Sequence, residues 1–127
     1  MEDKLFCDYF KELRMKSGQS IRQFCKDHDF DWGNVSKIER GVMAPPKSRS
    51  VLEKYALALG IENGSAEWEM FLDLAAAQNG QIPFDLQKDE NLIPLLPALF
   101  RTFRHKKLSR EKMKELAGQM RDGARKD

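Results

Sequence analysis

The sequence has few of the residues that catalytic and metal-binding sites require. It contains two cysteines and two histidines in 127 residues. Cys7 and Cys25 form no CxxC pair and lack the spacing of a metal site, and His28 and His105 belong to no nucleophile or metal-ligand arrangement. We therefore expect no enzyme activity, no metal and no cofactor. At core-like helical positions, both cysteines are expected to be reduced and to behave as small hydrophobic residues.

The sequence also lacks a long hydrophobic run. No stretch approaches the roughly 18 apolar residues of a membrane helix, and the opening MEDKLFCDYF lacks the basic start and apolar stretch of a signal peptide. Hydrophobic residues make up 41% and charged residues 33%, an ordinary balance for a globular chain. We expect a cytoplasmic protein with no membrane contact, built as one small domain with or without an appendage.

The formal net charge of +2 conceals a segregated pattern. Residues 1–60 are weakly basic, residues 61–90 carry one Lys against seven Asp and Glu, and residues 91–127 carry ten Lys and Arg against four acidic residues. An acidic middle between two basic ends indicates that the ends meet an anionic partner. The alternative is that the middle and the tail neutralise each other when the chain folds.

Apolar residues recur at helical spacing, and no segment shows sustained alternation with period two. Ser20, Asp31 and Ser65 are placed as helix N-caps, Gln23 completes a capping-box spacing with Ser20, and Gly41 is placed to end a helix. The pattern predicts an all-α fold of about five short helices around one core. The expected helices cover residues 4–16, two short segments within 20–41, and residues 48–59 and 65–80.

Residues 79–127 are expected to form a connector and a C-terminal extension. After a domain at 1–78, residues 79–91 have the composition of a connector, with one helical turn expected at Phe84–Leu86. Residues 92–127 combine a proline-interrupted apolar run, basic residues and a last amphipathic helix at about 108–120. We expect this helical C-terminal extension to mediate dimerisation or partner binding. Trp68, Phe71 and Leu72 offer a second dimer surface, unless they only complete the core.

Three sequence elements occur in a characteristic order. They are Phe10-Lys-Glu-Leu-Arg14, then Ser20 followed by Phe24 and Cys25, then Val35-Ser-Lys-Ile-Glu-Arg-Gly41 followed by Pro45. At residues 10–60 this series resembles the lambda-repressor-like (Cro/XRE type) helix-turn-helix family of transcriptional regulators. The resemblance implies a lambda-repressor-like five-helix domain, here followed by the extension.

The sequence departs from the family pattern at several positions. Ile21 stands where the family usually has glutamine, Cys25 where alanine is common, and Asp29 where the turn residue is usually glycine. Trp32 and Gly33 occupy positions that are often polar. The implied fold is compatible with these departures. Because of them, the resemblance does not predict which DNA sequence the protein binds.

The resemblance also implies roles for individual residues. The third helix would enter the major groove with its N-terminal residues towards the base edges. Base contacts are expected from Trp32, Gly33, Asn34 and Lys37. Phosphate contacts are expected from Arg22, Ser36, Arg40, Lys47 and Arg49. Arg14 and Glu39 are expected to form an ion pair between the first and third helices.

Together these features predict a sequence-specific regulator that binds double-stranded DNA. We expect a repressor acting as a homodimer on a palindromic operator, because one such domain covers only a half-site. The alternative is an antitoxin, in which residues 80–127 neutralise a toxin protein while the DNA-binding half represses its own operon. RNA binding fits less well, because the RNP-type aromatic motifs are absent.

Overall fold

The computed structural model describes residues 4–106, 111 and 115, and the chain divides into two compact units, Met1–Gln87 and Lys88–Asp127. The boundary falls inside the segment expected as a connector, so the first unit extends beyond residue 78. Its elements are α1 (Phe6–Lys16), α2 (Ile21–His28), α3 (Trp32–Glu39), α4 (Arg49–Ala58), α5 (Ala66–Gln78) and the 3-10 turn η1 (Phe84–Leu86). The second unit contains the 3-10 turn η2 (Ile93–Leu95) and α6 (Leu96–Lys106). The described residues form helices and no strand, which confirms the all-α class.

The helices of the first unit begin at the expected caps. Ser20, Asp31 and Ser65 each accept a hydrogen bond from the backbone N–H three residues later, at 2.9–3.1 Å. Each cap satisfies a donor that the first helical turn leaves without an intrahelical acceptor. The expected capping box is not completed in the expected way, because the Gln23 amide donates to Asp27 Oδ1 at 2.7 Å.

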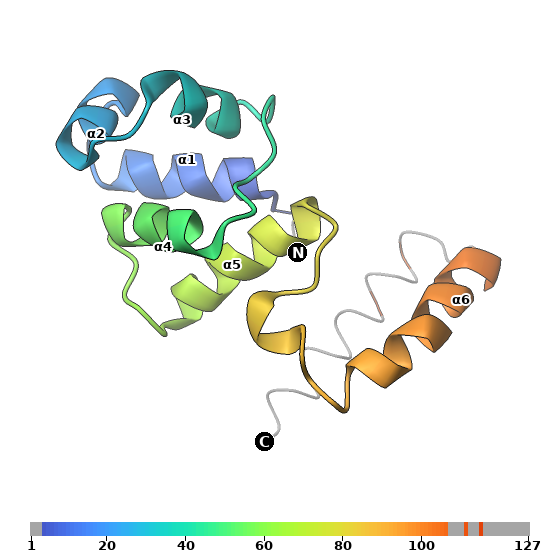
Figure 1. Cartoon of the computed structure of the whole chain (residues 1–127). Helices are drawn as coiled ribbons and strands as arrows, with labels where there is room; N and C mark the ends of the chain where they lie inside the picture. The colour runs from blue at the N-terminus through green and yellow to red at the C-terminus, as the bar shows by residue number, and fades with distance from the viewer. Residues whose placement is uncertain (1–3, 107–110, 112–114, 116–127) are drawn as a thin grey trace. The chain divides into compact units, whose positions relative to one another are not determined.

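Aromatic rings from four helices meet in the core of the first unit. Phe10 of α1 is fully buried, and its ring centroid lies 5.4–6.3 Å from those of four neighbours. These neighbours are Phe6 of α1, Phe24 of α2, Tyr55 of α4 and Phe71 of α5. Val35 and Ile38 of α3 join the same cluster. Figure 1 shows α2 and α3 on one side of α1, and α4 and α5 on the other.

Two side chains considered for a dimer interface belong to this core instead. Trp68 is 7% exposed and Phe71 is 0% exposed. Both lie on the inner face of α5, where they pack with the other core aromatics. They are therefore inaccessible to a second copy of the folded chain, and the alternative that they complete the core is correct. Leu72 is partly buried against the same cluster.

The end of α3 is fixed by a glycine turn. Gly41 has φ +73° and donates its N–H to Ile38 O at 3.1 Å, and the next N–H, that of Val42, donates to Lys37 O at 2.9 Å. These two bonds form a Schellman motif, which satisfies carbonyls left free at the helix end. A Cβ at Gly41 would also lie 3.5 Å from Cys7 Sγ of α1. The sulfur leaves room for an ordinary contact, so it is the left-handed backbone conformation that favours glycine here.

The second unit differs from the first in the exposure of its side chains. Within its described part no side chain is buried, and Leu95 and Phe100 are 61% and 51% exposed. Pro97 lies in the first turn of α6, where a proline costs no intrahelical hydrogen bond. Of the helix expected at about 108–120, the structure describes only residues 111 and 115, and both are helical. Over the part of the chain that the structure describes, no helix has the length and apolar character needed to cross a membrane.

Candidate nucleic-acid interface

The sequence places a tight turn between α2 and α3. Asp29 follows α2 with φ +58° and ψ +47°, the left-handed conformation that Asp and Asn tolerate better than most residues. Phe30 then donates its N–H to Cys25 O at 2.9 Å, and Asp31 caps α3. Phe30 also turns its ring towards the core, 4.5 Å from that of Tyr55. Three residues thus reverse the chain and fix the start of α3.

A side-chain ion pair joins α3 to α1. Arg14 Nε lies 2.6 Å from Glu39 Oε2 and Arg14 Nη2 lies 2.9 Å from Glu39 Oε1. The remaining guanidinium nitrogen, Nη1, donates to Gln19 O at 2.8 Å. The side chains are only 12% and 5% exposed. This is the pair that the family resemblance implies, and its parallel hydrogen bonds fix direction as well as distance.

The ion pair also sets the charge of Arg14. The hydrogen bond to Glu39 raises the pKa of Arg14, and it outweighs the opposing effect of burial. The guanidinium is therefore charged at every pH at which the protein is folded. This partly buried charge has its hydrogen bonds satisfied, and the paired N–H···O bonds give the contact between α1 and α3 a defined direction.

The buried and exposed faces of α3 are sharply divided. Val35 and Ile38 are 0% and 2% exposed and pack into the core. Asn34, Lys37 and Arg40 are exposed on the other side. The remaining expected contact residues of this helix are Trp32, which is 48% exposed, and Gly33 and Ser36, which are partly buried. The structure therefore presents the whole expected base-contact set on one short helix.

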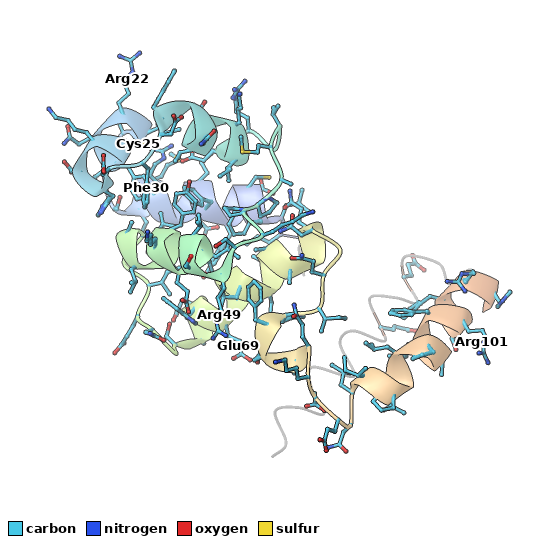
Figure 2. The ribbon with its side chains drawn as sticks, in the orientation of Figure 1. Arg22, Cys25, Phe30, Arg49, Glu69 and Arg101 are labelled. Atoms are coloured by element: carbon cyan, nitrogen blue, oxygen red, sulfur yellow. The ribbon has the colours of Figure 1, made fainter. Side chains whose placement is uncertain are left out.

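Arg22 of α2 lies against the first residue of α3. Its guanidinium carbon is 5.2 Å from the ring centroid of Trp32, a distance typical of a cation–π contact. Figure 2 shows Arg22 reaching outward from α2, while Cys25 and Phe30 lie towards the body of the domain. The two residues are ten positions apart on different helices, so no periodicity in the sequence predicted this contact.

Arg49 does not belong to this surface, contrary to the expectation that it contacts phosphate beside α3. Its guanidinium lies 5.8 Å from the ring centroid of Phe84, and its Nε lies 3.5 Å from Glu53 Oε2, four residues along α4. In Figure 2 Arg49 lies beside Glu69 and far from Arg22, across the domain. The sequence could not reveal this, because Phe84, the aromatic neighbour of the Arg49 guanidinium, lies 35 positions further along the chain. Lys47 is exposed in the segment that joins α3 to α4.

Most acidic side chains near α3 are engaged within the fold, and the exception is Asp29 of the turn, which is exposed. The side chain of Asp31 caps α3, Glu39 is paired with Arg14, and Asp27 accepts hydrogen bonds from Gln19 and Gln23. By contrast, Lys37 and Lys47 form no ion pair with any described residue. The charges left to face solvent along α3 are therefore mainly positive, which suits an anionic partner.

A cysteine helps to line the depression beside Trp32 on this surface. This residue, Cys25, is 4% exposed, and burial raises the pKa of its thiol, so the reactive thiolate is disfavoured. Both cysteines are free. No cluster of three or more His, Cys, Asp or Glu that could hold a metal ion occurs among the described residues.

The chain was compared with known proteins at the level of sequence and of structure. No family model, no curated protein and no solved structure matches it. The assignment of this surface therefore depends on its own geometry: a capped pair of short helices, an ion pair that fixes the second helix, and an exposed polar and cationic face.

Proposed function

We propose that this protein is a sequence-specific transcriptional regulator that binds double-stranded DNA through a lambda-repressor-like helix-turn-helix. In this proposal α2 is the scaffold helix and α3 is the recognition helix. The single observation that carries it is the Arg14–Glu39 pair, which fixes α3 from below while its polar side chains remain exposed. A helix of this kind fits the width of the major groove of B-DNA.

The exposed residues of α3 divide into two roles. Asn34 and Lys37 reach base edges, because an amide can pair with adenine and an ammonium group with the acceptors of guanine. Gly33 allows close approach, since it has no side chain to stand between the helix and the bases. The phosphate contacts come from the remaining cations and hydroxyl group near α3, which are Arg22, Ser36, Arg40 and Lys47.

The regulator acts as a homodimer in this proposal. One domain with one recognition helix covers a half-site, and two copies related by a two-fold axis read a palindromic operator. The second unit is the source of the dimer contact, because Leu95, Phe100 and Phe103 expose 38–61% of their surface there. Repression follows when such a dimer occupies a promoter.

A second candidate function is that of an antitoxin. The same exposed apolar side chains in the second unit favour it, because an apolar helix face can dock on a partner protein. It is tested by coexpressing the chain with the product of an adjacent reading frame. Rescue of growth by the full chain, and not by a chain that ends at Gln87, supports it; equal rescue by both, or by neither, opposes it.

The main proposal is tested by selecting a preferred sequence from a random DNA pool and then measuring the affinity of variants for it. Lys37→Ala should lose about 1–3 kcal/mol of binding free energy, confined to one base pair of each half-site. The matched control is Arg49→Gln, which removes a positive charge on the far side of the domain and should change affinity little. Failure to enrich any sequence, or an equal effect of Lys37→Ala on all sequences, would contradict the proposed reading role.

A further inference from the structure

Trp32 is an unusual residue for the start of a helix that enters DNA. It is the first residue of α3, and 48% of its surface is exposed although its ring is the largest apolar group on that helix. The aromatic residues of the core are by contrast 0–8% exposed. Nothing in the packing of the first unit requires an indole at this position. The ring is therefore available to a ligand.

Arg22 restricts how this ring can be placed. Its guanidinium lies 5.2 Å from the Trp32 ring centroid, so α2 and α3 each contribute one member of the contact. Trp32 helps to line an open depression, together with Arg22, Cys25, Lys26, Asp29 and Phe30. An arginine stacked on an aromatic face keeps the N–H donors at its edge free. The same Arg22 can thus hold the ring and donate to a phosphate oxygen.

The major groove offers few apolar groups that a ring at this position can contact. Base edges present hydrogen-bond donors and acceptors, and the exception is the C5 methyl group of thymine. An indole has one donor and an otherwise apolar surface, so it gains most from burying that methyl group. Gly33, the next residue, leaves the space beside Trp32 clear, and a Cβ there would lie 3.1 Å from the Asp31 cap oxygen.

We infer that Trp32 is a specificity-determining residue that reads the C5 methyl group of a thymine in each half-site, and that Arg22 positions it. This inference rests on the proposed DNA-binding function and assigns one base type to one residue. Arg22 acts through the ring as well as through phosphate, so its loss reduces the preference for the methyl group in addition to the overall affinity.

The test exchanges thymine for deoxyuridine, which removes only the methyl group. Each thymine of the selected operator is replaced in turn, and the dissociation constant of the full chain is measured for every duplex. For the wild type, one position per half-site should lose roughly 4-fold in affinity, the effect of one buried methyl group. For Trp32→Ala, the ratio of the dissociation constants for the deoxyuridine and thymine duplexes at this position should fall to 1. For Arg22→Gln, the ratio should lie between 1 and the wild-type value.

The control variant is Lys47→Gln, which removes an exposed cation outside the contact. It should weaken binding to the thymine and deoxyuridine duplexes equally. Because Trp32 is exposed, Trp32→Ala should remain folded, which thermal unfolding checks; Trp32→Leu provides a second apolar variant with no ring for Arg22 to stack on.

The outcomes separate the two proposals. A wild-type chain that selects no DNA sequence overturns both the proposed function and this inference. Selective binding with no position sensitive to deoxyuridine, or a ratio that persists in Trp32→Ala, overturns the inference alone. A ratio that Arg22→Gln leaves at the wild-type value overturns the positioning role of Arg22.

Discussion

The two units of this chain use apolar residues in opposite ways. In the first unit four phenylalanines, Phe6, Phe10, Phe24 and Phe71, are 0–1% exposed and touch one another across α1, α2 and α5. In the second unit Phe100 and Phe103, on a helix of similar length to α1, are 51% and 38% exposed. The first unit therefore carries its own core, whereas the described phenylalanines of the second unit are open to contact with other molecules.

The strongest test removes a ring from each unit. Phe10→Ala should lower the free energy of unfolding of the first unit by about 3–5 kcal/mol, because it leaves a cavity among four rings. Urea denaturation followed by tryptophan fluorescence reports this unit alone, since both tryptophans, Trp32 and Trp68, lie in it. Phe100→Ala is the matched control and should change this value by less than about 0.5 kcal/mol. Comparable losses in the two variants would show that the units share one core.

The next test concerns the pair that holds α3. Glu39→Gln should cost about 3 kcal/mol, because it leaves the Arg14 guanidinium charged with its carboxylate partner removed and only 12% of its side chain exposed. Glu53→Gln breaks the exposed Arg49–Glu53 pair and should cost roughly 0.3–0.5 kcal/mol. The free energies of unfolding of the two single variants and of the double variant Arg14→Met/Glu39→Met are measured by denaturation and compared. Equal costs for the two single variants would show that burial of the Arg14–Glu39 pair contributes nothing.

A third test separates the units. A chain that ends at Gln87 keeps η1, whose Phe84 packs against the core, and should unfold within about 1 kcal/mol of the full chain. Sedimentation should show this shortened chain as a monomer if the second unit supplies the dimer contact. A dimer of unchanged stability would place that contact in the first unit. A chain that ends at Gly80 lacks Phe84 and should be less stable.

The smallest expected effect is one of pH. Burial raises the pKa of Asp73 in the folded state, and the carboxylates of Glu69 and Asp85 raise it further. The folded state therefore binds its proton more tightly than the unfolded state, so Asp73 disfavours folding as pH rises above about 4. Asp73→Asn should be slightly more stable than the wild type at pH 7, and the difference should shrink towards pH 4. Melting temperatures measured from pH 4 to pH 7 check this, and a difference that does not depend on pH would contradict it.

Much of the first unit was predictable because its signals are local. Ser20, Asp31 and Ser65 form the caps that short-range sequence patterns indicate, and Gly41 ends α3 as expected. The turn at Phe84–Leu86 and the burial of Val35 and Ile38 follow the same logic. For the caps and turns the decisive hydrogen bond joins residues within about five positions, where backbone geometry leaves few alternatives, and for Val35 and Ile38 the helical spacing of apolar residues indicates the buried face.

The predictions that failed depend on distant residues. Arg49 was expected to contact phosphate with the residues around α3, but its guanidinium lies beside Phe84, 35 positions away in the chain, and far from Arg22 (Figure 2). Trp68 and Phe71 carry the same apolar stripe whether they face a core or a second copy of the chain, so only packing assigns them to the core. The Arg22–Trp32 contact had no signal of its own, because it joins two helices through side chains that are each plausible as exposed residues.

The sequence by itself determined the all-α class, the helix caps and the turn between α2 and α3, since these depend on backbone preferences and on hydrogen bonds between near neighbours. The tertiary structure alone decided which polar groups share a surface. It places Arg22 over Trp32 and turns Arg49 towards Phe84, whereas the Arg14–Glu39 pair was already expected from the family resemblance. Side-chain direction across helices is the sum of many packing contacts, each of small energy, and no spacing along the chain encodes that sum.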